Sequence, residues 1–309
     1  MAMTGVLRPG HVQLRVMDMA EAMAFYKDVL GLVHTGTDDS GRAYFKTWDE
    51  RDHSSVILRQ ADRAGLDHVA FKVRDAAALD TLESALRAYG VATERIPAGE
   101  LLATGERVRF QIPTGHLVDL YARKTDVGNG MPYVNPAPWT AQSEHGMGPL
   151  RMDHLALAGP NVADAVKLFE EALDFYVTER VLAGDGVSDL GVFLTCGNKV
   201  HDIALVALTA EPGKLHHVAF LQESWERVLR CADIFGMNEQ AVDMGPTRHG
   251  VSRGTTVYGF DPSGNRIENF CGGYMPYPDY RPITWTFDQA GAGLLYHYRT
   301  LAKLSDALT

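Results

Sequence analysis

The feature of this chain that most constrains its fold is an internal duplication. His11 and His154 lie 143 residues apart, and the residues that follow them match in type at that spacing. Farther along the spacing grows to 149 residues, where L-D-H-V-A-F around His68 matches L-H-H-V-A-F around His217. At the same spacing Gly115 meets Gly264, and Asp119 meets Glu268. Repeats of this length indicate a structural unit that is used more than once.

The unit itself is repeated within each half. His11 and His68 each begin a predicted strand that leads into a helix and then into further strands. After His11, for example, Asp18 and Glu21 can cap an amphipathic helix that Gly31 ends. We therefore predict an α+β fold of four βαβββ modules, paired into two domains whose sheets each curl into an open mixed β-barrel.

The length of 309 residues agrees with two domains. We expect an N-terminal domain over residues 1–135 and a catalytic domain over residues 150–289. The Pro- and Gly-rich residues 136–149 are typical of a linker. Residues 290–309 form a tail, with a predicted helix from about Ala290 to Leu308, and the aromatic residues before it are expected to cover a pocket mouth or a subunit contact.

Composition argues against several classes of partner. The net charge of −10 disfavours nucleic acid, which needs a basic surface. No run of about 18 apolar residues predicts a membrane span, and the N-terminus lacks the pattern of a signal peptide. The three cysteines are widely spaced without a C-x-x-C motif, so we expect reduced thiols and a cytoplasmic location.

Three short predicted strands in the second half carry potential metal ligands. His154, His217 and Glu268 each lie in a β-compatible run, and side chains alternate across a sheet. If the modules curl, inward residues of different strands converge, and small neighbours such as Ala156 and Ala219 leave room for a ligand. Two imidazoles and one carboxylate form the facial triad of non-haem Fe(II) oxygenases, which leaves metal positions open.

The duplication also indicates which copy is active. His201, His249 and Tyr258 can move or orient protons, whereas a subtraction of 149 places Asp52, Glu100 and Arg109 at the equivalent positions. We therefore interpret His11, His68 and Asp119 as a structural remnant without a metal. We expect the other candidates to be structural or to face away from the metal; these are His34, His53, His116, His216, Cys271 and His297.

These motifs resemble the vicinal oxygen chelate (glyoxalase-like) superfamily, and within it the extradiol ring-cleavage dioxygenases. The resemblance covers nearly the whole chain, and its most specific stretches are G-P-T-R-H-G, F-D-P-S-G-N-R-x-E-x-F-C-G-G and Y-P-D-Y-R-P-I-T-W-T. It implies Fe(II) held by His154, His217 and Glu268, with His201, His249 and Tyr258 as acid-base residues. Asn269 departs from the apolar residue that is expected after the carboxylate.

The implied reaction cleaves catechol and substituted catechols with O2 at the 2,3 (meta) bond, giving 2-hydroxymuconate semialdehyde, as in the degradation of aromatic compounds. The resemblance also implies a homotetramer. Two alternatives share the fold: a glyoxalase-type isomerase or thiol transferase, and a resistance protein that sequesters its ligand. The histidines and tyrosine around the triad argue against both. Fe(II) and Mn(II) both accept such ligands, so the sequence leaves the metal open.

Overall fold

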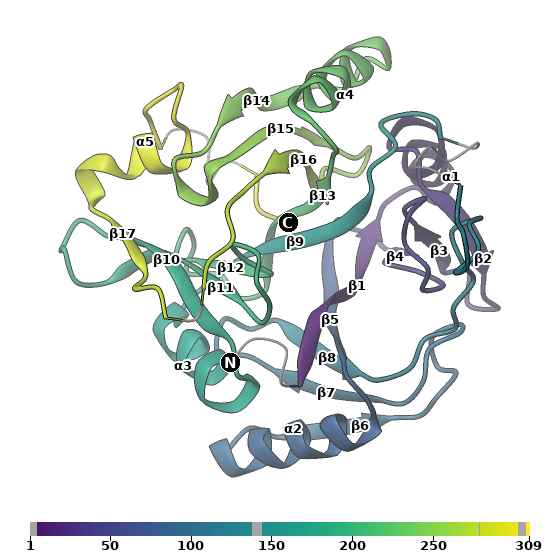
Figure 1. Ribbon diagram of the computed structural model, residues 1–309, viewed down its shortest axis with the longest axis horizontal. Coiled ribbons are helices and arrows are strands. Elements are labelled where there is room, and N and C mark those ends of the chain that lie inside the picture. The colour runs from purple at the N-terminus through teal and green to yellow at the C-terminus, as the bar shows by residue number, and fades with distance from the viewer. Residues whose placement is uncertain (1–4, 138–143, 278, 302–306) are drawn as a thin grey trace.

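The computed structural model describes residues 5–137, 144–277, 279–301 and 307–309. The N-terminal half contains two βαβββ modules (Figure 1). The first consists of β1 (Val6–Val16), α1 (Met19–Ala24) with a π-helical turn (Phe25–Val29), β2 (Val33–Thr37), β3 (Ala43–Lys46) and β4 (Val56–Gln60). The second consists of β5 (Gly65–Val73), α2 (Ala76–Tyr89), β6 (Thr93–Ile96), β7 (Arg107–Gln111) and β8 (Leu117–Tyr121).

The C-terminal half repeats this plan. Its first module consists of β9 (Arg151–Ala158), α3 (Val162–Leu173), β10 (Tyr176–Leu182), β11 (Asp189–Thr195) and β12 (Ile203–Val206). Its second consists of β13 (Lys214–Leu221), α4 (Trp225–Met237), β14 (Val242–Arg248), a 3-10 turn (Val251–Arg253), β15 (Gly254–Phe260) and β16 (Arg266–Gly272). The tail adds β17 (Ile283–Trp285), a 3-10 turn (Phe287–Gln289) and α5 (Ala290–Leu294). The prediction of four modules is confirmed.

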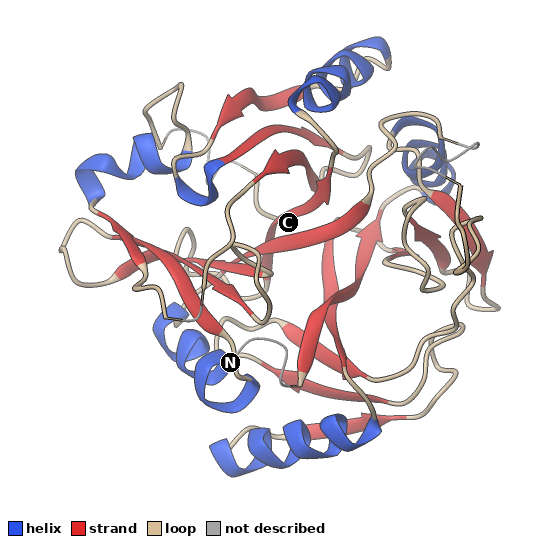
Figure 2. Cartoon of the chain, viewed as in Figure 1, coloured by secondary structure: helices blue, strands red, loops and turns tan. Residues whose placement is uncertain are grey.

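Each half forms one mixed sheet. The strand orders are β2-β3-β4-β1-β5-β8-β7-β6 and β14-β15-β16-β13-β9-β12-β11-β10-β17. Antiparallel pairing of β1 with β5, and of β9 with β13, joins the two modules of each half. The described edge strands of a sheet do not pair with each other, so both sheets remain open, with the helices on their outer sides (Figure 2).

Local sequence explains the helix ends. Asp18 accepts the N–H of Glu21 at 3.0 Å, and Asp75 accepts that of Ala78 at 2.8 Å, as N-cap residues do. The helices bury their apolar faces in a core that is shared by both halves, where the ring of Phe71 lies 5.4 Å from that of Phe175. This packing holds the two sheets together near their central strands.

The tail differs from the prediction. The helix α5 ends at Leu294, and residues 295–301 are not helical; residues 302–306 lie outside the described part. Gly291 and Gly293 weaken the helix, and the N–H of Tyr296 donates to Arg248 O instead of continuing it. Of the expected linker, residues 138–143 lie outside the described part, and Met147 donates its N–H to Val29 O at 2.9 Å.

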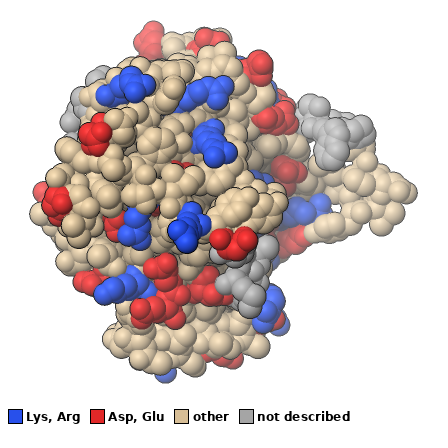
Figure 3. Space-filling model, turned by 60° about the vertical axis from the view of Figure 1, so that its left-hand side comes forward, with Lys and Arg blue, Asp and Glu red and all other residues tan. Residues whose placement is uncertain are grey.

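The surface carries both signs of charge. On the face drawn in Figure 3, basic and acidic side chains are interspersed, and most of that face carries neither. No helix among the described residues is long and apolar enough to cross a membrane.

Candidate active site

The three predicted ligands lie on adjacent strands and converge. Strand register places His154 of β9 opposite Ala219 of β13, and Ala219 opposite Glu268 of β16, so the three side chains share one face. His217 is two residues from Ala219 and therefore points to the same face. Ala156, which pairs with His217 across β9 and β13, lines the cavity beside the triad, as predicted from the sequence.

The geometry is that of a compact donor set. Nε2 of His154 lies 3.0 Å, and Nε2 of His217 lies 3.1 Å, from Oε2 of Glu268. One ligand atom from each residue lies within 4.8 Å of the others, and all three residues are buried. Although Nε2 of His217 lies 3.1 Å from Oε2 of Glu268, it makes no well-aligned hydrogen bond to any described residue, so it is free to bind another group.

The protonation states suit a cation. Burial would raise the pKa of Glu268, but the neighbouring His217 and the hydrogen bond from His154 hold that pKa well below its usual range. Burial lowers the pKa of His217 to about 4. Glu268 and His217 are therefore in the forms that bind a metal ion. Burial would lower the pKa of His154, but its hydrogen bonds to Asp153 and Glu268 raise it, so this imidazole must release a proton when an ion binds.

Outer contacts orient the ligands. Oδ2 of Asp153 lies 3.2 Å from Nδ1 of His154, the ring nitrogen that faces away from the triad. Such carboxylate–imidazole pairs fix the ring orientation of metal-binding histidines. Thr256 Oγ1 donates to Oε1 of Glu268 at 2.6 Å. The sequence analysis missed Thr256, although its position two residues before Tyr258 on one strand was a usable signal.

The predicted acid-base residues surround the triad on two sides. Nε2 of His249 lies 2.9 Å from the hydroxyl of Tyr258 and 3.4 Å from Oε1 of Glu268. The ring of His201 lies on the other side, with its centroid 4.1 Å from that of His154. Nδ1 of His201 has no hydrogen-bond partner within the described residues, and burial keeps its pKa well below the usual value.

Beside the triad lies a largely apolar cavity. It extends from the triad toward β11, β12 and the tail, where Leu294 of α5 forms part of the wall. Glu268 is the sole charged side chain of the described lining other than histidine. The apolar part of the lining is Ala156, Leu190, Gly191, Phe193, Ala204, Val206, Leu208, Val251, Phe270 and Leu294.

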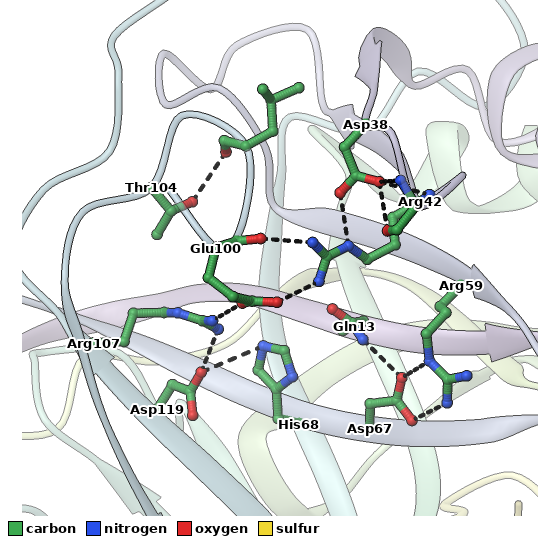
Figure 4. A network of polar contacts seen from close by, with 12 residues as sticks. Gln13, Asp38, Arg42, Arg59, Asp67, His68, Glu100, Thr104, Arg107 and Asp119 are labelled. Carbon is green, nitrogen blue, oxygen red and sulfur yellow. Dashed lines mark hydrogen bonds and ion pairs between the residues drawn. The ribbon is translucent and has the colours of Figure 1, made fainter. Parts of the chain in front are cut away.

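The first-half copy is brought together in the same way but contains cations. Nε2 of His11 and Nε2 of His68 are 3.2 Å apart, and Oδ2 of Asp119 is 3.6 Å from Nε2 of His68. Arg107 and Arg109 donate to Asp119 at 2.6 and 2.7 Å, as Figure 4 shows for Arg107. Asp119 is thus already paired with two guanidinium groups.

Strand register relates the two copies. Arg109 pairs with Asp119 as Tyr258 pairs with Glu268, so Arg109 is the counterpart of Tyr258, as predicted. By the same register Arg107 replaces Thr256. A buried amine also reaches this site: Nζ of Lys124 lies 3.1 Å from Nδ1 of His11, and burial lowers the pKa of Lys124 to about 7.

One predicted counterpart is wrong. Subtraction of 149 places Asp52 opposite His201, but β4 and β12 pair with β1 and β9 in registers that place Ser54 there. The extra residues of the second half are therefore divided between two places rather than inserted at one. The carbonyl of Ser54 accepts a hydrogen bond from Lys124 at 2.8 Å.

Comparison with known proteins agrees with this arrangement. The family described as Catechol 2,3-dioxygenase-like N-terminal domain matches residues 66–125, and the Glyoxalase/Bleomycin resistance protein/Dioxygenase superfamily matches residues 151–269. A metapyrocatechase of Pseudomonas sp. (strain CF600) is 47% identical over 298 residues, which cover 96% of each chain. The chain belongs to the extradiol ring-cleaving dioxygenases. It is thus an oxidoreductase, and the isomerase and resistance-protein alternatives are excluded.

Two solved structures and a more distant relative of the same family are also similar to this chain. The 2,3-dioxygenase LapB from Pseudomonas sp. KL28 matches with a TM-score of 0.91 and 62% identity, covering 93% of this chain and 99% of that one. Homoprotocatechuate 2,3-dioxygenase from Brevibacterium fuscum, in complex with 3,4-dihydroxyphenylacetate, has a TM-score of 0.82 and 27% identity over 94% and 88% of the two chains. A manganese-dependent 2,3-dihydroxybiphenyl 1,2-dioxygenase from Geobacillus genomosp. 3 is 28% identical over 93% and 92%.

Proposed function

We propose that this extradiol dioxygenase cleaves catechol and uncharged substituted catechols at the 2,3 bond with O2, and forms 2-hydroxymuconate semialdehyde during the breakdown of aromatic compounds. The observation that carries the proposal is the His154, His217 and Glu268 cluster at the end of an apolar cavity, flanked by His201 on one side and by His249 and Tyr258 on the other. The 47% sequence identity to a metapyrocatechase also supports the proposal.

The cofactor of this proposal is Fe(II). His154, His217 and Glu268 would hold it, because their donor set is the facial triad and the ionised Glu268 lacks a Lys or Arg hydrogen-bond partner among the described residues. When bound, the ion supplies a site at which the diol oxygens and O2 come together and exchange electrons. A manganese-dependent relative makes Mn(II) the alternative to be tested.

His249 and Tyr258 act on the aromatic substrate in this proposal. Their polar atoms are 2.9 Å apart and both residues line the cavity, so His249 can accept a hydroxyl proton from catechol while Tyr258 donates a hydrogen bond to the resulting oxygen. Burial raises the pKa of Tyr258 well above its usual value, which keeps this phenol protonated as a hydrogen-bond donor. His201 faces the opposite side and would hold and then deliver a proton to the oxygen side.

The lining of the cavity determines the substrate charge that we expect. Its described walls contain no Lys or Arg. A carboxylate substituent would therefore lose its hydration without gaining a cation, which is costly. Uncharged ring substituents lose little and gain contact with Leu190, Phe193 and Leu294.

Anaerobic reconstitution tests the proposed activity. Metal-free protein is loaded with Fe(II) or, separately, Mn(II); it is then mixed with catechol and air while the yellow product is followed by absorbance. We expect turnover with Fe(II), and loss of turnover and bound metal in His217→Ala. Turnover with Mn(II) but not Fe(II) would overturn the cofactor assignment, and no product with either metal would overturn the proposed substrate.

The assembly and location are part of the same proposal. The described tail exposes aromatic side chains that a lone chain would leave in water, which supports a homotetramer. The exposed residues are Tyr277, Tyr280, Phe287, Tyr296 and Tyr298. The three cysteines are free and buried, which supports a cytoplasmic location. An active monomer in sedimentation velocity at working concentration would contradict the tetramer.

A further inference from the structure

Glu179 is a buried carboxylate that the proposed reaction does not use. It lies on β10, is 1% exposed, and does not line the cavity of the active site. Its oxygens accept three hydrogen bonds from three different segments: the N–H of Ser252 at 2.6 Å, the hydroxyl of Tyr274 at 3.0 Å and Nε1 of Trp285 at 2.8 Å. Hydrogen bonds to a carboxylate are stronger than those between neutral groups, so Glu179 holds these three segments firmly together.

The first of these segments is a wall of the active site. Residues 248–253 carry His249, and Val251 and Ser252 line the cavity. Ser252 has a φ of 56°, a left-handed conformation that few residues other than glycine adopt. Such a conformation persists where surrounding contacts determine it, and the N–H of Ser252 is the group that Glu179 binds.

The third segment supports the same loop from the other side. Trp285 is the last residue of β17, and the tail continues from it through α5 and binds the loop directly. Gly250 donates its N–H to Gly293 O at 2.7 Å, and Nδ1 of His249 contacts Leu294 O. Glu179 therefore holds both the loop that carries His249 and the tail strand that leads to its support.

We infer that Glu179 is a positioning residue for substrate binding: its carboxylate ties the 248–253 loop to the tail, and so sets the place of His249 and of the adjoining cavity wall. The inference rests on the proposed function for its kinetic consequence, but its structural part does not. A carboxylate is required because three donors converge on it. A glutamine at this position would place its amide N–H groups, which are donors, opposite at least one of these three donors, so that neither could form a hydrogen bond.

The chemistry gives a specific rescue experiment. In Glu179→Gln one donor faces an amide donor, so we expect kcat/KM for catechol to fall about tenfold or more, mainly through KM, with bound iron unchanged. Trp285→Phe removes the donor that opposes the amide. The loss of kcat/KM in the double variant Glu179→Gln/Trp285→Phe should therefore be smaller than the combined losses of the two single variants. Glu83→Gln, which removes another buried carboxylate, on α2 in the first half, is the matched control and should leave KM unchanged.

A second measurement does not depend on activity. Hydrogen–deuterium exchange of the 248–253 amides should be faster in Glu179→Gln than in wild type. In the double variant it should be slower than in Glu179→Gln. If Glu179→Gln does not fold, Tyr274→Phe and Trp285→Phe each remove one donor and must raise KM and exchange in the same direction. Wild-type KM and exchange in Glu179→Gln, or losses that simply add in the double variant, would overturn the inference. Wild-type protein that fails to cleave catechol would overturn the proposed function instead, while the exchange experiment still tests Glu179.

Discussion

The duplicated sites make a prediction about metal stoichiometry. We expect each chain to bind one divalent ion, at His154, His217 and Glu268, although His11, His68 and Asp119 repeat the same residue types on the equivalent strands. His217→Ala should lose the ion and the activity. His68→Ala should keep both, because the first-half site already contains its own cations.

The size of the effect can be worked from the contacts. Arg107 and Arg109 lie 2.6 and 2.7 Å from Asp119 oxygens, and Lys124 lies 3.1 Å from His11. A divalent ion about 4 Å from one such guanidinium is repelled by about 8 kcal/mol at an effective dielectric constant of about 20, so the two arginines give about 16 kcal/mol. Burial lowers the pKa of Lys124 to about 7, so this amine is only partly charged and adds less. Attraction to Asp119 at a ligand distance of about 2.2 Å returns about 15 kcal/mol on the same scale. The repulsion from the two arginines alone thus cancels the attraction to Asp119, which leaves no net electrostatic free energy to hold an ion in the first-half site.

Elemental analysis provides the assay. Wild type, His217→Ala and His68→Ala are reconstituted with Fe(II) without air, separated from excess metal, and analysed for iron per chain, with circular dichroism to check that each variant is folded. We expect ratios near one, zero and one. Two ions per chain in wild type, or loss of iron from folded His68→Ala, would refute the electrostatic reasoning.

Three other predictions concern roles, charge and pH. His201→Phe should still bind catechol without air but lose about 100- to 10,000-fold in turnover, whereas His249→Phe should also weaken catechol binding; the reverse pattern in anaerobic titration and rapid mixing with O2 would exchange their roles. 3,4-Dihydroxyphenylacetate should be a poorer substrate than 4-methylcatechol by at least about tenfold in kcat/KM, since the apolar cavity offers its carboxylate no cation; equal values would contradict this. Burial lowers the pKa of His116 to about 4, so the unfolded chain binds the extra proton as the pH falls from about 6.5 to 4. Metal-free wild type should therefore lose up to about 3 kcal/mol more stability over that window than His116→Gln in urea unfolding, and parallel losses would contradict it.

The convergence of His154, His217 and Glu268 could be predicted from the sequence because the evidence for it is periodic, whereas their role as metal ligands stays a prediction. The constant spacing of 149 residues identifies His217 and Glu268 as the counterparts of His68 and Asp119. Side-chain alternation then places His217 on the same face as Ala219, and the strand register places Ala219 opposite Glu268. The same logic located Tyr258 and its counterpart Arg109. The domain limits at residues 135, 150 and 289 stay predictions.

The predictions failed where contacts are not periodic. The helix expected to reach Leu308 ends at Leu294, because tail backbone groups bind the loop at Arg248 instead. The Asp52 counterpart was wrong because loop lengths change between strands, and constant subtraction cannot follow them. Lys124 lies beyond the end of β8, and no spacing rule indicates that its side chain turns back to His11.

The two halves of the chain each stabilise a buried carboxylate, but with different side chains. Each sheet buries one carboxylate at the equivalent position, Asp119 or Glu268, and a buried carboxylate must be compensated. In the first half Arg107 and Arg109 supply positive charge from within the chain. In the second half the equivalents of both arginines are uncharged, so hydrogen bonds from the surrounding histidines and Thr256 stabilise Glu268, and a cavity lies open beside it. Replacing one arginine in the first half would therefore not create a metal site, since the remaining guanidinium still neutralises Asp119.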